Sequence, residues 1–206
     1  MSEISNKNII EIGKNIISIE IDALKKLEQS VDENFIRAVE MINSCKGKVI
    51  VTGTGKSGLI GRKISATMSC CNIPSIYLNA YECENGDLGV VRENDLLITI
   101  SNSGETGVLK HLVVPSCKTL GCKVIALTGN LQSWLAKESD IAIYIGVEKE
   151  ACYLNINASA STTTTLAMGD ALALTAMELR GTTREKTYFL HQGGAWGKAL
   201  KEEFNK

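Results

Sequence analysis

Apolar residues recur every three or four positions between residues 9 and 42, a spacing that is typical of amphipathic helices. Ser30 and Asp32 interrupt this pattern, and residues of these types favour the start of a new helix. We therefore predict two helices in this region. The apolar stripe of the first helix is wider than one surface helix needs. Burial within its own domain and packing against a partner subunit explain that width equally well.

From residue 48 onward the pattern changes to short, β-branched apolar runs separated by helical segments. Strands buried on both faces have this appearance, and we predict five, at residues 48–52, 75–78, 95–101, 123–128 and 141–145. Helices are expected at residues 57–71, 105–120, 133–138 and 161–180. This alternation predicts an α/β fold with a doubly wound, five-stranded parallel sheet flanked by helices, a flavodoxin-like three-layer sandwich.

The domain organisation follows from length and composition. A chain of 206 residues without a low-complexity linker is expected to form one domain. Residues 1–45 would supply the N-terminal helices, residues 48–180 the α/β core, and residues 182–206 a tail that carries His191 and the glycine pair Gly193-Gly194.

Charge and cysteine usage exclude several classes of function. The 22 basic and 23 acidic residues give a formal net charge of −1, so no basic field gathers nucleic acid or an anionic membrane. The seven cysteines include no Cys-x-x-Cys pair, and the two histidines are far apart, which favours neither a disulfide framework nor a metal site. No apolar run reaches the roughly 18 residues of a membrane span. We expect a cytoplasmic protein that acts on a small molecule.

The loop after the first predicted strand has the letters G-x-G-x-x-G between Gly53 and Gly58. A dinucleotide site would need an acidic residue roughly 20 positions later, where Asn79 and its neighbours offer none. A Walker A loop would need a glycine where Ile50 stands. The loop still brings Gly55, Lys56 and Ser57 to the start of a helix, an arrangement suited to a phosphate, although a tight strand-to-helix turn would look similar.

Two more polar clusters follow strand ends. The segment of residues 101–106 combines hydroxyls, an amide and a glycine, contributed by Ser101, Asn102, Ser103, Gly104 and Thr106. The other cluster comprises Ser159 and then residues 161–165, including Ser161 and Thr162, and precedes or opens the long helix. A capping and turn region is one explanation, and contact with a sugar fits its many hydroxyls better. Glu150 follows the fifth strand. Because parallel strands end at one edge, we expect these groups to meet in one crevice and bind a phosphorylated sugar.

Several separated motifs resemble those of the sugar isomerase (SIS) domain. The loops at residues 53–58 and 101–106 resemble its phosphate-binding segments, and further segments are similar to those of arabinose 5-phosphate isomerases. These are Gly86-Asp87-Leu88-Gly89, Lys149-Glu150-Ala151-Cys152, residues 168–173 and His191-x-Gly193-Gly194. The resemblance runs from about residue 48 to residue 200, and the CBS domains that many of these isomerases carry have no counterpart in the 206 residues.

The resemblance implies an activity and roles. Such enzymes interconvert D-ribulose 5-phosphate and D-arabinose 5-phosphate through an enediol, usually for Kdo biosynthesis, and need no metal or organic cofactor. Lys56, Glu150 and His191 match the catalytic lysine, glutamate and histidine, and Ser57 with residues 101–106 matches the phosphate contacts. In the family the histidine-bearing tail reaches a neighbouring subunit, which implies a homo-oligomer, often a tetramer, with shared active sites.

Four positions depart from the family pattern, and one of them is Gln192, which replaces a proline after the tail histidine. Val108 stands where a second carboxylate is typical, so Glu105 is the acid that would replace it. Asn79 and Asn85 stand where histidines are frequent, in a loop expected to read sugar hydroxyls, and they put the identity of the sugar in doubt. An isomerase of another ketose phosphate, a hexulose or heptulose, is therefore an alternative. A non-catalytic phosphosugar sensor is the other, although residues 1–45 show no convincing helix-turn-helix.

Overall fold

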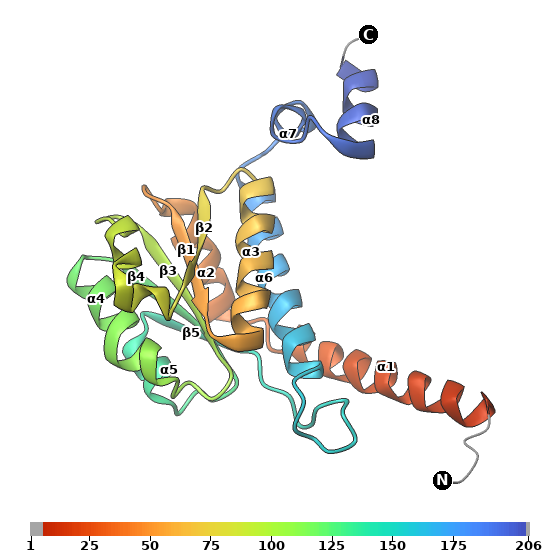
Figure 1. Cartoon of the computed structure of the whole chain (residues 1–206). Helices are drawn as coiled ribbons and strands as arrows, with labels where there is room; N and C mark the ends of the chain where they lie inside the picture. Colours follow the sequence, from red (N-terminus) through yellow and green to blue (C-terminus); the bar gives the residue numbers. More distant parts are fainter. Residues whose placement is uncertain (1–5, 205–206) are drawn as a thin grey trace.

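The computed structural model describes residues 6–204 and centres on a five-stranded, all-parallel sheet with the strand order β2-β1-β3-β4-β5 (Figure 1). The strands are β1 (Val49–Gly53), β2 (Ser75–Asn79), β3 (Leu96–Ser101), β4 (Lys123–Thr128) and β5 (Ile141–Tyr144). Every residue of β1 and β3 is buried, as their unbroken apolar runs predicted. The predicted fold class is confirmed.

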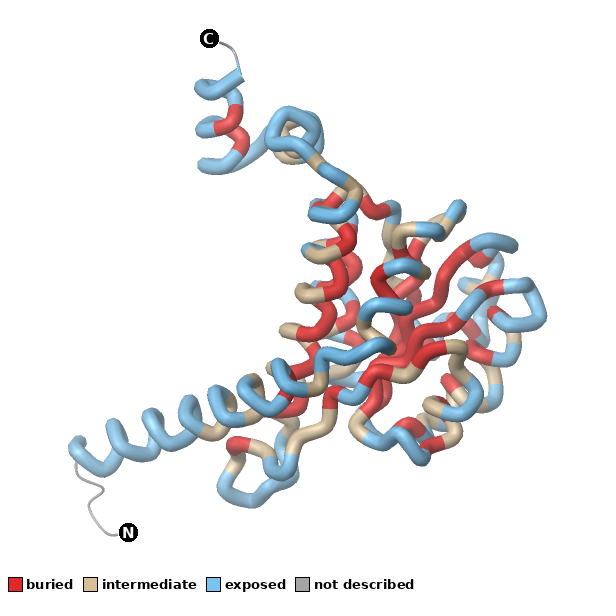
Figure 2. Tube along the Cα trace, turned by 180° about the vertical axis from the view of Figure 1, so that it is seen from behind, coloured by how far each residue is buried: buried red, intermediate tan, exposed pale blue. Residues whose placement is uncertain are grey.

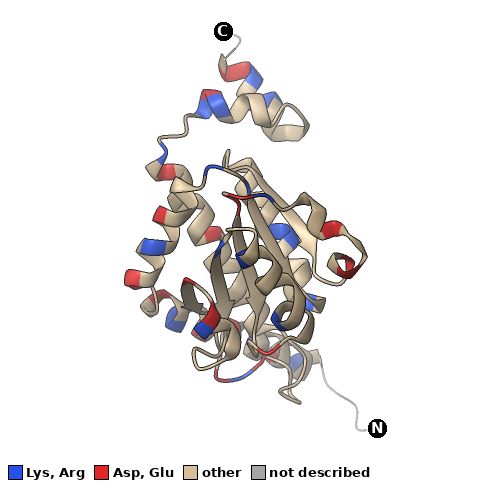
Figure 3. Ribbon diagram, turned by 90° about the vertical axis from the view of Figure 1, so that its left-hand side faces the viewer, with Lys and Arg blue, Asp and Glu red and all other residues tan. Residues whose placement is uncertain are grey.

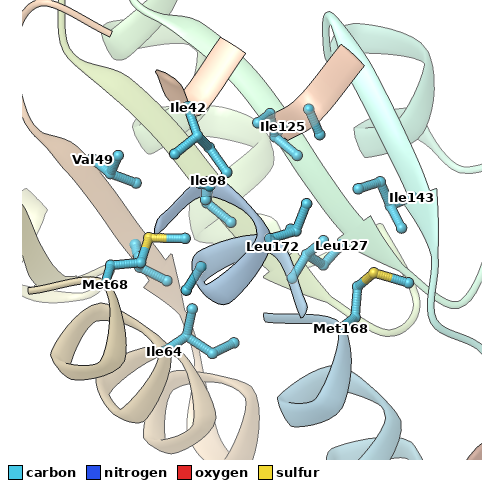
Figure 4. Packing of buried hydrophobic residues seen from close by; sticks show 14 of the residues in the cluster. Ile42, Val49, Ile64, Met68, Ile98, Ile125, Leu127, Ile143, Met168 and Leu172 are labelled. Carbon is cyan, nitrogen blue, oxygen red and sulfur yellow. The ribbon is translucent and has the colours of Figure 1, made fainter. Parts of the chain in front are cut away.

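Helices cover both faces of the sheet. On one face lie α2 (Glu33–Ser44), α3 (Gly55–Cys70) and α6 (Ala160–Leu179), and Figure 4 shows their apolar side chains meeting those of the strands. The other face is covered by η1 (Glu82–Asn85), η2 (Asp87–Val90), η3 (Leu109–Val113), α4 (Val114–Thr119) and α5 (Trp134–Glu138). The red, buried segments in Figure 2 mark the resulting three layers.

The helix predicted at residues 105–120 differs in detail. It contains a π-helical turn, η3, followed by α4, in which Pro115 occupies one of the first positions. Proline has no backbone N–H and cannot donate to the carbonyl four residues earlier, which here belongs to His111. The wider turn is the local response to that missing hydrogen bond.

The N-terminal helix α1 (Asn6–Gln29) projects away from the sheet, and only Leu27 along it is buried (Figures 1 and 2). Asp32 separates α1 from α2 and caps α2 by accepting from the backbone N–H of Asn34 at 2.9 Å. Two helices were predicted, and two are present. Six of the seven isoleucines of the wide stripe are 39–61% exposed, so burial within this chain does not account for them. They are Ile9, Ile10, Ile12, Ile16, Ile17 and Ile21.

The tail forms two helices, α7 (Arg184–Leu190) and α8 (Gly194–Phe204), at the opposite end of the sheet from the strand-end loops (Figure 1). In the view of Figure 3, ribbon segments of Lys and Arg are interspersed with those of Asp and Glu. Across residues 6–204, none of the helices has the length and apolar character needed to cross a bilayer.

Packing of α3 against α6 depends on the small size of Gly169. A methyl group there would overlap the fully buried side chain of Ile64. We expect Gly169→Ala to lower the free energy of unfolding by about 1–3 kcal/mol, as overpacking does in close-packed cores. Urea denaturation measures this. In the matched control, Gly13→Ala on α1, the new methyl meets no atom within 4 Å. An unchanged urea midpoint for Gly169→Ala would contradict the close helix contact.

Candidate active site

The turn between β1 and α3 is built for close approach of the backbone. Gly55 has φ of +54°, in the left-handed region that favours glycine. A side chain at Gly58 would strike the hydroxyl of Tyr77, which donates to the Gly53 carbonyl at 3.2 Å. Lys56 in the first turn of α3 is exposed. The structure therefore shows the tight turn, and binding of a phosphate by this loop stays a prediction.

The loop after β3 forms a small polar nest. The hydroxyls of Ser101 and Thr106 lie 2.8 Å apart, and Ser101 Oγ accepts from the backbone N–H of Gly104 at 3.0 Å. Gly104 has φ of +70°, and its Cα faces the side chain of Ser133 so closely that no larger residue fits. Asn102 and Ser103 remain exposed at the rim. Hydroxyl groups and backbone N–H groups gathered in this way suit a phosphate.

Glu105 has other partners in this structure. Its Oε1 accepts from the backbone N–H of Trp134 at 2.7 Å, and its Oε2 lies 2.9 Å from Lys110 Nζ. These two contacts hold the pKa of Glu105 below its ordinary value. The carboxylate ties the loop to the start of α5, and its suggested role in place of Val108 stays a prediction. Val108 itself is half-buried and packs against the buried apolar residues on the face of the sheet that η3, α4 and α5 cover.

Glu150 lies in the loop between β5 and α6, with its carboxylate at the N-terminus of α6. Its Oε2 accepts from the backbone N–H of Ser159 at 2.8 Å, from the Ser159 hydroxyl at 3.1 Å and from the backbone N–H of Ser161 at 3.1 Å. Burial raises the pKa of Glu150, but hydrogen bonds donated by Ser161 and Ser159 outweigh burial and leave the pKa below its ordinary value. Glu150 is thus a firmly held carboxylate anion.

The hydroxyls of three threonines at the start of α6 donate hydrogen bonds to backbone carbonyls. Thr162 Oγ1 donates to the carbonyl of Ser159 at 2.7 Å, and Thr164 Oγ1 donates to that of Ile145 at 2.8 Å. Thr165 Oγ1 donates to the carbonyl of Ser161 at 2.7 Å. These bonds are the capping and turn role that the sequence analysis set below sugar contact. Contact of Ser161 and Thr162 with a sugar therefore stays a prediction.

His191 is not brought to this edge of the sheet within one chain. Its Nε2 lies 3.2 Å from Cys70 Sγ, at the last residue of α3. Lys56 is near the first residue of that helix, and the 14 intervening steps of 1.5 Å separate the two ends by about 21 Å. Figure 1 shows the tail at the far end of α3 and α6. In this arrangement of the chain, His191 and Lys56 do not share a site, and a site that combines them from different chains stays a prediction.

A cleft beside the β1–α3 turn contains residues that the sequence analysis missed. It has a volume of about 290 Å³ and is lined by Gly55, Arg62, Tyr77, Asn79 and Tyr81, among others. The Arg62 guanidinium lies 5.7 Å from the centre of the Tyr77 ring. In the sequence, nothing more pointed to Arg62 than its place on the predicted helix at residues 57–71, six residues after Lys56. Asn85, at the end of η1, is exposed and does not line this cleft.

Residues 41–175 match the family model described as the SIS domain. The chain belongs to the SIS domain family. The predicted resemblance is confirmed by a relative from Escherichia coli K12 named arabinose 5-phosphate isomerase KdsD, 43% identical over 190 residues. That alignment covers 92% of this SIS chain and 58% of the relative, so the chain spans a little under three fifths of that enzyme.

Two solved structures resemble this SIS chain over almost their whole length. One is the structure of a putative sugar-phosphate isomerase from Listeria monocytogenes. It has 34% identity and a TM-score of 0.88, and the match covers 92% of this chain and 99% of the other. The second, from Escherichia coli CFT073 in complex with arabinose 5-phosphate, has 36% identity and a TM-score of 0.87, covering 91% and 99%. Within residues 6–204, which the structure describes, no cluster of three or more His, Cys, Asp or Glu side chains could hold a metal ion.

Proposed function

We propose that the chain is an aldose–ketose isomerase that interconverts D-ribulose 5-phosphate and D-arabinose 5-phosphate. The observation that carries the proposal is the polar nest of residues 101–106, placed at the same sheet edge as Lys56 and Glu150. Relatives named arabinose 5-phosphate isomerase and a similar structure in complex with arabinose 5-phosphate support it.

The chemistry assigns a role to each group. The nest and Ser57 hold the phosphate, so that binding energy from this remote group orients the sugar. Glu150 takes the proton from C1 of the ketose, the electrons of that bond form the enediolate, and the proton returns to C2. Lys56 stabilises the phosphate or the oxygen that becomes negative. His191 opens the furanose ring or moves the hydroxyl proton.

A shared site explains where His191 lies. Because His191 and Lys56 are at opposite ends of α3, the histidine of a site would come from another subunit. The exposed isoleucines of α1 and the exposed Leu174 and Leu179 of α6 provide apolar faces for such an assembly. We propose a homo-oligomer, with a tetramer as the expected form. Since a doubly charged sugar ester does not cross a bilayer unaided, we place the activity in the cytoplasm.

Asn79, Asn85 and Val108 favour a second candidate substrate class. Neutral side chains at these positions leave fewer ionisable groups around the sugar than the family pattern has, and Asn79 lines the cleft beside Gly55. A hexulose or heptulose phosphate would be isomerised by the same proton transfer, with a different set of hydroxyl contacts.

The proposed reaction is tested by incubating the purified chain with ribulose 5-phosphate in deuterated water and following it by NMR. We expect the arabinose product to appear with deuterium at C2, because the transferred proton exchanges with solvent on the base. Turnover of a hexulose or heptulose phosphate with none of ribulose 5-phosphate would select the second candidate. Binding of all these esters without exchange would contradict an isomerase.

A further inference from the structure

The carboxylate of Glu150 is held by an unusual use of a helix cap. Ser159 occupies the N-cap of α6, yet its hydroxyl makes no capping bond to the backbone of its own helix. Instead, that hydroxyl donates to Glu150 Oε2 at 3.1 Å and accepts from the backbone N–H of Ala151 at 2.9 Å. The carboxylate takes the place of the capping oxygen, accepting from the backbone N–H groups of Ser159 and Ser161.

The backbone of Glu150 is fixed as well. Its N–H donates to Asn155 Oδ1 at 2.7 Å, and Asn155 has φ of +55°, which an asparagine tolerates better than most residues. The Ser159 hydroxyl therefore joins the two ends of the loop between Glu150 and α6 at the point where the carboxylate sits. Three hydrogen bonds to the carboxylate end on Oε2, and the Ser161 hydroxyl also stabilises the carboxylate anion.

We propose that Ser159 is a positioning residue, which holds Glu150 by Oε2 so that the carboxylate is fixed where it exchanges the proton with the sugar carbon. This inference rests on the proposed isomerase function. A carboxylate fixed at one oxygen loses little freedom on reaching the reactive geometry, and small displacements of a catalytic group are costly. Ser159 touches no substrate atom and acts through Glu150.

The pH dependence of kcat will contain contributions from the charged and titratable groups around Glu150. The adjoining cavity, of about 680 Å³, is lined on the loop by Lys149, Cys152 and Tyr153, and on α1 by uncharged residues. Backbone N–H groups of Asn157 and Leu154 lower the pKa of Cys152 to about 7, well above that of Glu150. From α1, Glu20 reaches Thr163 of α6, and Lys26 pairs with Glu148.

The test compares Ser159→Ala and Ser159→Thr in the full-length chain. Loss of the hydroxyl removes one donor from Oε2, so the pKa of Glu150 rises, and the acid limb of the kcat profile moves to higher pH by roughly one unit. At neutral pH we expect kcat to fall about tenfold with KM within about twofold. Ser159→Thr retains a hydroxyl and should restore both values. Thr163→Ala is the matched control, because its hydroxyl contacts Glu20 and not Glu150.

A second measurement separates this inference from the proposed function. The carboxyl carbon of Glu150 is titrated by ¹³C NMR, with the signal assigned by its loss in Glu150→Gln. A raised pKa together with a shifted acid limb supports the positioning role. An unchanged pKa in Ser159→Ala overturns it, and so does an equal loss of kcat in the alanine and threonine variants. If the wild-type chain isomerises no sugar, the proposed function fails, and the titration alone then decides whether Ser159 sets the state of Glu150.

Alanine is a poor residue at an N-cap position, so Ser159→Gly provides a second version of the same change. Glycine is tolerated at N-caps at a cost of only a few tenths of a kcal/mol, which corresponds to less than a twofold change in the folding equilibrium. A folded Ser159→Gly chain with the wild-type acid limb would also overturn the inference.

Discussion

Replacing Glu150 with glutamine is expected to lower kcat for the isomerisation by about a hundredfold or more, with KM changed by no more than a few-fold. An amide cannot accept the proton of the carbon acid, so the step that forms the enediolate loses its base. Steady-state kinetics with the substrate found by NMR measures both constants. The loss of deuterium exchange into recovered substrate would show that proton abstraction is the step removed.

The geometry of the site allows Glu150→Gln to remove the base without loss of the hydrogen bonds that cap α6. The carbonyl oxygen of the glutamine can replace Oε2 and still accept from the backbone N–H groups of Ser159 and Ser161, so the start of α6 remains capped. Glu148→Gln is the matched control. It lies in the same loop, exposed, and its carboxylate pairs with Lys26 at 2.6 Å. Its activity should stay within about twofold of wild type, because an exposed ion pair contributes little to stability. Full activity in Glu150→Gln would remove Glu150 from the role of base.

The sheet could be predicted because its signal is local. The run Val49-Ile50-Val51 and its counterparts are β-branched and short, and every such run became a parallel strand. The edge at which the strand-end loops meet follows from the parallel direction of the strands. That edge holds Lys56, Ser103 and Glu150, and their meeting in one crevice stays a prediction.

What the sequence did not reveal depends on contacts between distant residues or on single hydrogen bonds. The position of His191 beside Cys70, 121 residues away in the chain, is set by the packing of the tail and has no local signature. The bonds from Thr164 and Thr165 to backbone carbonyls could not be predicted, because composition does not tell whether a hydroxyl faces a cavity or a carbonyl. Ser159 counted only as one hydroxyl of that polar cluster, and the structure shows its hydroxyl turned to Glu150.

The position of His191 leads to the second large effect. His191→Ala alone and Glu150→Gln alone should each lose about a hundredfold or more in kcat, because each removes a group that handles a proton. If a site combines Glu150 of one chain with His191 of another, the two variants complement each other when mixed. A site is intact when its glutamate comes from a His191→Ala chain and its histidine from a Glu150→Gln chain. With random exchange of equal amounts, about a quarter of the sites meet both conditions.

We therefore expect co-refolded mixtures to recover about a quarter of the wild-type activity per site. The same fraction is expected for a two-fold symmetric dimer and for a tetramer. Exchange of chains is verified by native mass spectrometry with two tags of different mass. Mixing Glu150→Gln with Lys56→Met is the control: both residues lie at the same edge of one chain, so every site of the mixture lacks one of them and no activity should return. Verified mixed oligomers of the first pair without recovered activity would show that His191 acts within its own chain, which would require the tail to move through about the 21 Å length of α3.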